Sequence, residues 1–117
     1  MGISLKRIYE KAEPEDGYRI LVDRLWPRGI SKEKADIDEW IKDIAPTNDL
    51  RKDYHDGQME WKDFRKEYMA QLTEHRETLR DIASRAKDGK VTLVFSSKNT
   101  ERNNATVLKE YLGRLKI

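Results

Sequence analysis

Residues 91–95 read Val-Thr-Leu-Val-Phe, and this stretch decides the fold class of the chain. β-Branched and aromatic side chains favour an extended strand, and here they make both faces of the strand apolar. Such strands are typical of the centre of a parallel sheet that is covered on both sides. Asp88-Gly89 ends a helical region before the strand, and a polar loop over residues 96–101 follows it.

A final helix follows this loop and is expected to begin at Arg102 or Asn103. Its buried face is predicted by apolar residues that recur every three or four positions, namely Ala105, Val107, Leu108, Tyr111, Leu112 and Leu115. The end of the chain therefore has the order strand, polar loop, helix.

The same order occurs earlier in the chain. The apolar run Ile20-Leu21-Val22, within residues 18–22, reads as a buried strand, and the loop DRLWPRG, residues 23–29, comes directly after it. Ser31 is a suitable N-cap, and an apolar stripe predicts a helix from about Lys32 to Ile44. The loop crowds two arginines, an aspartate, a tryptophan and a proline into seven residues, which is wasteful for packing alone.

The remaining elements are predicted from spacing. Alternating apolar residues at the N-terminus predict a first short strand, which either runs parallel to the strand at 18–22 or forms a hairpin with it. A short helix is expected from Thr47 or Asn48 to about Tyr54. From Met59 to residue 86 the pattern fits one long bent helix or two in succession.

These patterns predict a single α/β domain over residues 1–117. We expect three layers, with a small, mainly parallel sheet and helices on both of its faces. With 117 residues the chain has no room for a second independent core.

The composition narrows the class of protein. The net charge of +2 comes from 24 basic and 22 acidic residues, so charge alone does not argue for a nucleic-acid or membrane partner. The positive excess lies in residues 1–30 and 87–117, and if these ends meet they form a basic face suited to a small anionic ligand. There is no cysteine, no signal-like segment and no apolar run of membrane-spanning length, which favours a cytoplasmic location.

The two loops that follow the strands are the candidate site, because the carboxyl ends of parallel strands meet at one edge of a sheet, where α/β proteins bind ligands. In an enzyme, Asp23 is expected to act as a general base or to orient an arginine, and Arg24 is the second candidate catalytic residue. The other candidates are expected to bind the anion, with the tryptophan as a wall of the pocket. They are Trp26, Arg28, Ser97, Lys98, Asn103 and Asn104.

A purely structural interpretation of the same residues stays open. Asp23 and Arg24 also suit pairing with each other or capping of neighbouring backbone, and Trp26-Pro27 also suits a packed corner. Lysine and asparagine at a helix start are common as loop and cap residues.

Other kinds of site have little support in the sequence. His55 and His75 have no partner at metal-ligand spacing, so no metal is expected. The chain has no glycine-rich phosphate loop and no serine nucleophile elbow, and we expect no cofactor. The rival function is a non-catalytic module that associates with nucleic acid or with another protein; nucleic acid is the less favoured partner, and the oligomeric state stays open.

Motifs spread over nearly the whole chain point to a known family. They are Lys6-Arg7-Ile8-Tyr9, Asp16-Gly17-Tyr18-Arg19, the run 22–34, Asp38-Glu39-Trp40, Leu50-Arg51, the Trp61-Phe64-Tyr68 spacing, and Val91-Thr92-Leu93 followed by Lys98 and Asn103. Together they resemble the YeaO-like proteins, a short branch of a widespread family classed as a domain of unknown function. The resemblance implies a shared α/β scaffold and a polar site at one edge of the sheet.

Longer members of that broader family place cysteine and histidine groups after the last strand. This sequence has residues 95–98 and Asn103-Asn104 at the corresponding places. The resemblance therefore does not extend to cysteine- or histidine-dependent chemistry, and it names no reaction.

Overall fold

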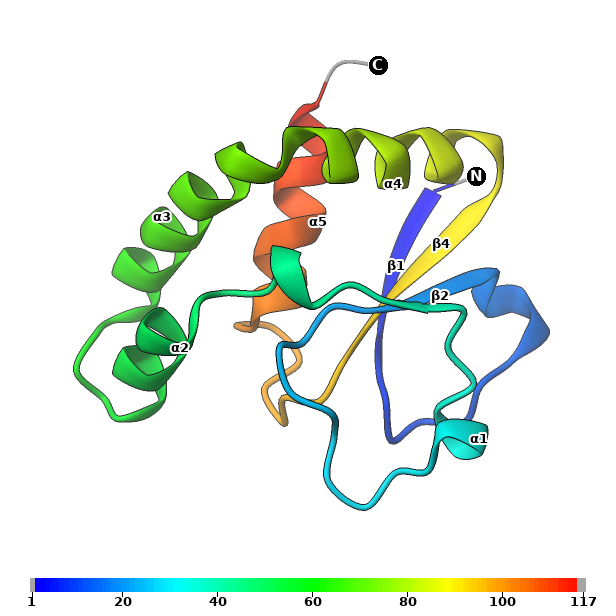
Figure 1. Ribbon diagram of the computed structural model, residues 1–117, viewed down its shortest axis with the longest axis horizontal. Coiled ribbons are helices and arrows are strands. Elements are labelled where there is room, and N and C mark those ends of the chain that lie inside the picture. The colour runs from blue at the N-terminus through cyan, green and yellow to red at the C-terminus, as the bar shows by residue number, and fades with distance from the viewer. Residues whose placement is uncertain (1, 116–117) are drawn as a thin grey trace.

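The centre of the molecule is a sheet of four parallel strands in the order β1-β4-β2-β3 (Figure 1). The strands are β1 at Gly2–Arg7, β2 at Tyr18–Leu21, β3 at Glu39–Trp40 and β4 at Lys90–Phe95. This computed structural model describes residues 2–115. The predicted α/β class with a parallel sheet is confirmed, and β4 lies inside the sheet with a neighbour on each side.

The relation between the first two strands is settled by β4, which lies between them. Leu93 of β4 pairs with Leu5 of β1 on one side and with Ile20 of β2 on the other, and both pairings are parallel. The strands β1 and β2 therefore form no hairpin, and the three carboxyl ends emerge at the same edge.

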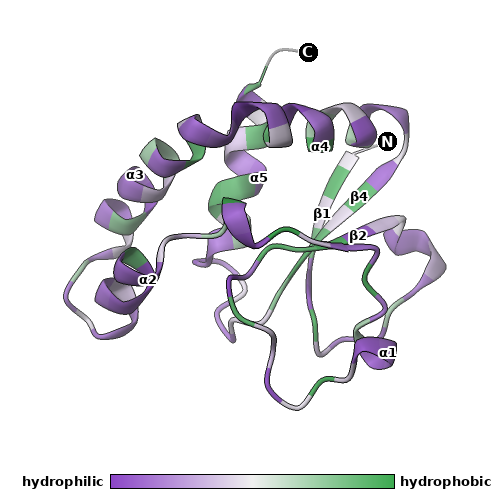
Figure 2. Cartoon of the chain, in the orientation of Figure 1, coloured by the Kyte–Doolittle hydropathy of each residue, from purple (hydrophilic) through white to green (hydrophobic). Residues whose placement is uncertain are grey.

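The longer helices cover one face of the sheet. They are α2 at Asn48–His55, α3 at Trp61–Leu72, α4 at Arg76–Asp88 and α5 at Asn104–Arg114. Of the two alternatives for residues 59–86, two successive helices are present, separated by the 3-10 turn η3 at Thr73–His75. In Figure 2, hydrophilic residues predominate along α4 and much of α3, whereas β1 and β4 show a mixture of hydrophobic and intermediate residues. None of the helices in residues 2–115 combines the length and apolar character needed to span a bilayer.

The core under these helices is built from alternate strand positions. Ile20 and Val22 of the second strand segment and Val91, Leu93 and Phe95 of β4 all point to this side and are buried. Alternation places their neighbours on the other face of the sheet, as the period of a strand requires.

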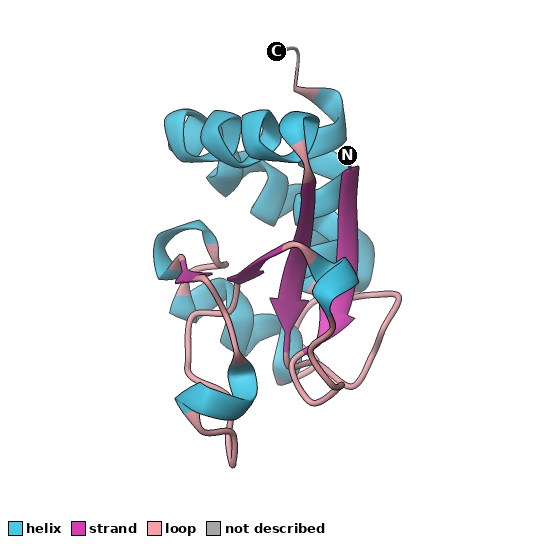
Figure 3. Cartoon of the chain, turned by 90° about the vertical axis from the view of Figure 1, so that its right-hand side faces the viewer, coloured by secondary structure: helices cyan, strands magenta, loops and turns pink. Residues whose placement is uncertain are grey.

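The second face carries a smaller core and only one short helix, α1, at Lys32–Ala35. Ile8, Leu21, Ala35 and Val94 are buried there, and loops complete the layer (Figure 3). The expectation of helices on both faces holds, although the two helical layers differ greatly in size.

The helix predicted from Lys32 to Ile44 was wrong in its length. The helix begins as expected, with the hydroxyl of Ser31 accepting a hydrogen bond from the Lys34 backbone N–H. It ends after one turn because Asp36 adopts a left-handed conformation with φ +45°, which does not continue a helix.

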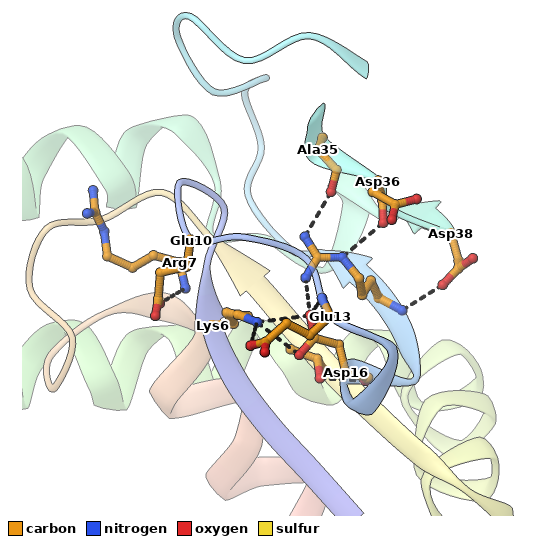
Figure 4. Close-up of polar contacts among 10 residues, drawn as sticks. Lys6, Arg7, Glu10, Glu13, Asp16, Ala35, Asp36 and Asp38 are labelled. Carbon is orange, nitrogen blue, oxygen red and sulfur yellow. Dashed lines mark hydrogen bonds and ion pairs between the residues drawn. The ribbon is translucent and has the colours of Figure 1, made fainter. Parts of the chain in front are cut away.

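Arg19 explains why the chain leaves the helix there. Its backbone N–H donates to the Asp38 carboxylate at 2.8 Å, and its carbonyl accepts from the Asp38 backbone N–H at 2.8 Å. Its guanidinium donates to the carbonyl oxygens of Ala35 and Asp36 (Figure 4). These bonds draw the segment alongside β2, where it forms β3, so a tertiary interaction overrides a helical pattern.

Arg19 also belongs to a buried ionic cluster around Asp16. The Asp16 carboxylate accepts from the Arg19 guanidinium at 2.7 Å, from the Lys6 ammonium at 3.1 Å and from the Glu13 backbone N–H at 3.0 Å. Burial alone would raise the pKa of Asp16, but the hydrogen bonds from the Glu13 backbone and Lys6, and then from Arg19, outweigh it and lower the pKa. The cluster joins β1, β2 and α1.

We predict that Asp16→Asn lowers the free energy of unfolding at pH 7 by about 3 kcal/mol, because it leaves the buried Arg19 without a counter-charge and Lys6 with only the exposed carboxylate of Glu13. The lowered pKa means that the carboxylate stabilises the fold fully above its unfolded pKa of about 3.9. This contribution is lost as the pH falls through the lower pKa of the folded state. Urea unfolding at a series of pH values measures the difference between the two proteins, and a difference that stays constant into strong acid would contradict the argument.

Candidate functional site

A pocket of about 560 Å³ lies at the edge where the carboxyl ends of β1, β2 and β4 emerge. Both loops of the sequence-based prediction line it. All eight candidate residues are among its lining residues, namely Asp23, Arg24, Trp26, Arg28, Ser97, Lys98, Asn103 and Asn104. The topology therefore brings the whole predicted set together.

Asp23 forms the floor of this pocket. One carboxylate oxygen, Oδ2, accepts from the backbone N–H of Ser96 at 2.9 Å and from its hydroxyl at 2.7 Å. The other, Oδ1, accepts from the side-chain amide of Asn104 at 3.1 Å. That same amide donates to the carbonyl of Val22 at 3.0 Å, so the ends of β2 and β4 and the start of α5 are tied together.

Arg24 points toward the chain that leads into α2. Its guanidinium donates to the carbonyl oxygens of Pro46 at 2.8 Å and Ala45 at 3.1 Å. It forms no ion pair with Asp23 within residues 2–115. Of the two structural alternatives for these residues, capping of backbone is present and pairing with each other is not.

Trp26 and Pro27 form one wall of the pocket. The Trp26 indole N–H donates to the carbonyl of Ile30 at 2.7 Å, and its ring packs edge-on against Trp40 with 5.4 Å between centroids. Pro27 is buried. The packed corner and the pocket wall are therefore the same structure.

In the loop that follows β4, some polar side chains hold the fold together and others make few bonds to the rest of the protein. Asn103 is 3% exposed and caps α5, accepting from the Thr106 N–H and donating to the Asn99 carbonyl. The hydroxyl of Ser97 bonds only within its own loop, to Asn99. Lys98 is exposed at the mouth of the pocket.

The pocket also contains functional candidates that the sequence-based prediction missed. They are Arg7, Tyr9, Arg51, Tyr54, His55 and Arg102. A signal existed for Arg7, because it ends β1 and so reaches the same edge as the other two strands. No local signal marked Arg51 and His55, since the packing of α2 against the rest of the fold places them there.

The charges of the pocket are one-sided. Six cationic side chains line it against a single carboxylate, that of Asp23. Within residues 2–115 none of the six forms an ion pair. The Nε atom of Arg51 is buried without any hydrogen-bond partner, which is unusual for a guanidinium nitrogen. The described residues contain no group of acidic and histidine side chains placed to hold a metal ion.

Arg7 shows how the cations are held. Its Nε and one Nη donate to the carbonyl oxygens of Ser97 and Ser96 at 2.8 and 3.1 Å, and its guanidinium lies over the ring of Tyr9, 5.0 Å from the centroid. The Tyr9 hydroxyl donates to the carbonyl of Arg28 at 3.0 Å. Backbone carbonyls thus fix this cation without neutralising it.

A family model matches the chain over all of its described residues. The model of the family described as the inactive DUF488-N3 subclade matches residues 2–115. The chain belongs to this family. It is 47% identical to the uncharacterized protein YeaO of Escherichia coli over 98% of its own length and 100% of that protein. It is 34% identical to the uncharacterized protein Rv3073c of Mycobacterium tuberculosis, over 95% of its length and 93% of that protein. No solved structure matches it.

We predict that Asp23→Ala lowers the free energy of unfolding by about 2 kcal/mol, because it removes three hydrogen bonds and leaves the partly buried Ser96 N–H without its acceptor. The matched control is Ser97→Ala, whose hydroxyl bonds only within its loop and whose loss should change stability by less than about 0.5 kcal/mol. Urea unfolding followed by circular dichroism compares them. Equal effects of the two substitutions would contradict the role assigned to Asp23.

Proposed function

We propose that the chain binds a small anion in the pocket at the carboxyl edge of its sheet. The observation that carries the proposal is the excess of six cationic side chains over one carboxylate, with no ion pair to any of the six within residues 2–115. Cations that share a concave surface without counter-charges attract anions strongly. Guanidinium groups are especially suited to carboxylate or phosphate oxygens.

The cations divide into two groups by depth. Arg28, Lys98 and Arg102 are exposed at the mouth, where they attract the anion and contact its outer side. Arg7, Arg24 and Arg51 are partly buried in the lining of the pocket.

The proposal is binding without turnover. Asp23 is the one carboxylate that lines the pocket, and both of its oxygens already accept hydrogen bonds from protein donors, so it is a poor choice for a general base. The description of the family as an inactive subclade supports the same conclusion. The chain then serves as a sensor or carrier of its ligand.

We predict that the charge-reversing double variant Arg28→Glu, Lys98→Glu weakens the binding of inorganic phosphate at least tenfold, because two cations at the mouth become anions. Both side chains are exposed, so the variant is expected to fold. Titration of ¹⁵N-labelled protein with phosphate, followed by NMR chemical shifts, gives the dissociation constant and maps the site.

The matched control is Lys62→Glu, Lys66→Glu, which reverses two exposed lysines of α3 near Arg114, outside the pocket. Phosphate affinity should be unchanged in this variant. The rival function predicts instead that an oligonucleotide binds with a steep dependence on salt and that the control weakens it as much as the pocket variant does. That result would replace the pocket with an extended nucleic-acid surface.

A further inference from the structure

The size and the apolar side of the pocket, as well as its charge, bear on the kind of ligand that it fits. Resting on the proposed function, we propose that its ligand is an aromatic phosphate, an organic molecule in which a flat ring carries a phosphate group. The argument combines the size of the pocket, its apolar side, the flatness of that side and its charge.

The size of the pocket exceeds what an inorganic anion needs. A volume of about 560 Å³ lies within the range of roughly 300–1,000 Å³ that is typical of sites for organic small molecules. A bare phosphate has five heavy atoms and would leave most of this space to water. The pocket therefore has room for a body attached to the anionic group.

An apolar surface lies beside the cations. Leu25, Trp26, Pro27, Pro46 and Tyr54 contribute to it. A second feature of the pocket does not depend on charge. Two large hydrophobic side chains are exposed within residues 2–115, and both line this pocket. They are Leu25, which is 56% exposed, and Tyr9, which is 45% exposed.

Exposed hydrophobic side chains that cluster around one pocket mark a surface that a ligand covers. Leu25 follows the pocket residue Arg24 and has no place in either core cluster, so packing of the fold does not explain its position. A ligand in the pocket that lies against Leu25 would bury its side chain.

The shape of the apolar side favours a flat ring over a flexible chain. Proline rings and aromatic rings make rigid walls, and Tyr54 is itself held in place by stacking on Phe64 with 4.5 Å between centroids and 23° between planes. Aromatic rings pack on such walls in offset or edge-on contact, and arginine guanidinium groups stack on their faces. A flat ligand uses both kinds of surface.

The charge of the pocket favours a phosphate over a carboxylate as the head group. Six cations against one carboxylate leave several positive charges for the ligand, and a phosphate monoester carries close to two negative charges at neutral pH. It also has three oxygens that accept hydrogen bonds from several guanidinium groups at once.

Isothermal titration calorimetry on the intact chain tests the proposal with four probes: inorganic phosphate, ribose 5-phosphate, phenyl phosphate and adenosine monophosphate. We expect phenyl phosphate and adenosine monophosphate to bind at least tenfold tighter than the two phosphates without an aromatic ring. The ratio between these two tells whether the ring is recognised alone or as part of a nucleotide.

The variant Leu25→Ser tests the apolar side directly, and because Leu25 is exposed the variant is expected to fold. It should weaken the ring-bearing probes about fivefold and leave inorganic phosphate unchanged. Equal affinities for all four probes, or no effect of Leu25→Ser on the ring-bearing ones, would overturn the aromatic phosphate and leave the anion site standing. Absence of binding for every probe would overturn both.

Discussion

The carboxylate of Asp23 is the interaction on which the site depends. Its hydrogen bonds to Ser96 and Asn104 join the ends of the two central strands to the start of α5. The backbone carbonyl of Asp23 also accepts a hydrogen bond from the indole N–H of Trp40 at 2.7 Å, which ties β3 to the same residue. Parallel strands bring their ends together only approximately, and this network fixes them. The network therefore fixes the floor of the pocket, and the cationic side chains lie around it.

The parallel sheet explains how basic residues from distant parts of the chain come to share one surface. The two ends of the sequence carry its positive excess, and the parallel pairing of β1 with β4 brings them side by side. Arg7 then lies against the carbonyls of Ser96 and Ser97. Asp23, the only acidic residue among the described residues that line the pocket, bonds to Ser96 and Asn104. Within the described residues, no ion pair therefore neutralises the cationic side chains of the pocket.

Sequence patterns predicted the features that depend on residues close together in the chain. They failed for features that depend on contacts between distant residues. The apolar run of β4 and the polar loops after β2 and β4 were sufficient to place eight residues at one edge, because sheet topology does the rest. The helix after Ser31 was predicted too long, since its interruption depends on Arg19, a residue of another strand. Arg51 was missed for the same reason. Its place in the lining of the pocket depends on how α2 packs against the rest of the fold, which no local sequence pattern predicts.

The candidate residues of the pocket differ in how far protein groups engage them. Asp23 and Asn103 are engaged by protein groups, whereas Arg28, Lys98 and Arg102 at the mouth form no ion pair within residues 2–115. Like charges held together repel, and this repulsion destabilises the folded state relative to the unfolded chain. An anion that binds only the folded protein offsets that cost in proportion to its occupancy. The anion of the proposed function would therefore raise the stability of the fold by reducing the repulsion among the cations of the pocket.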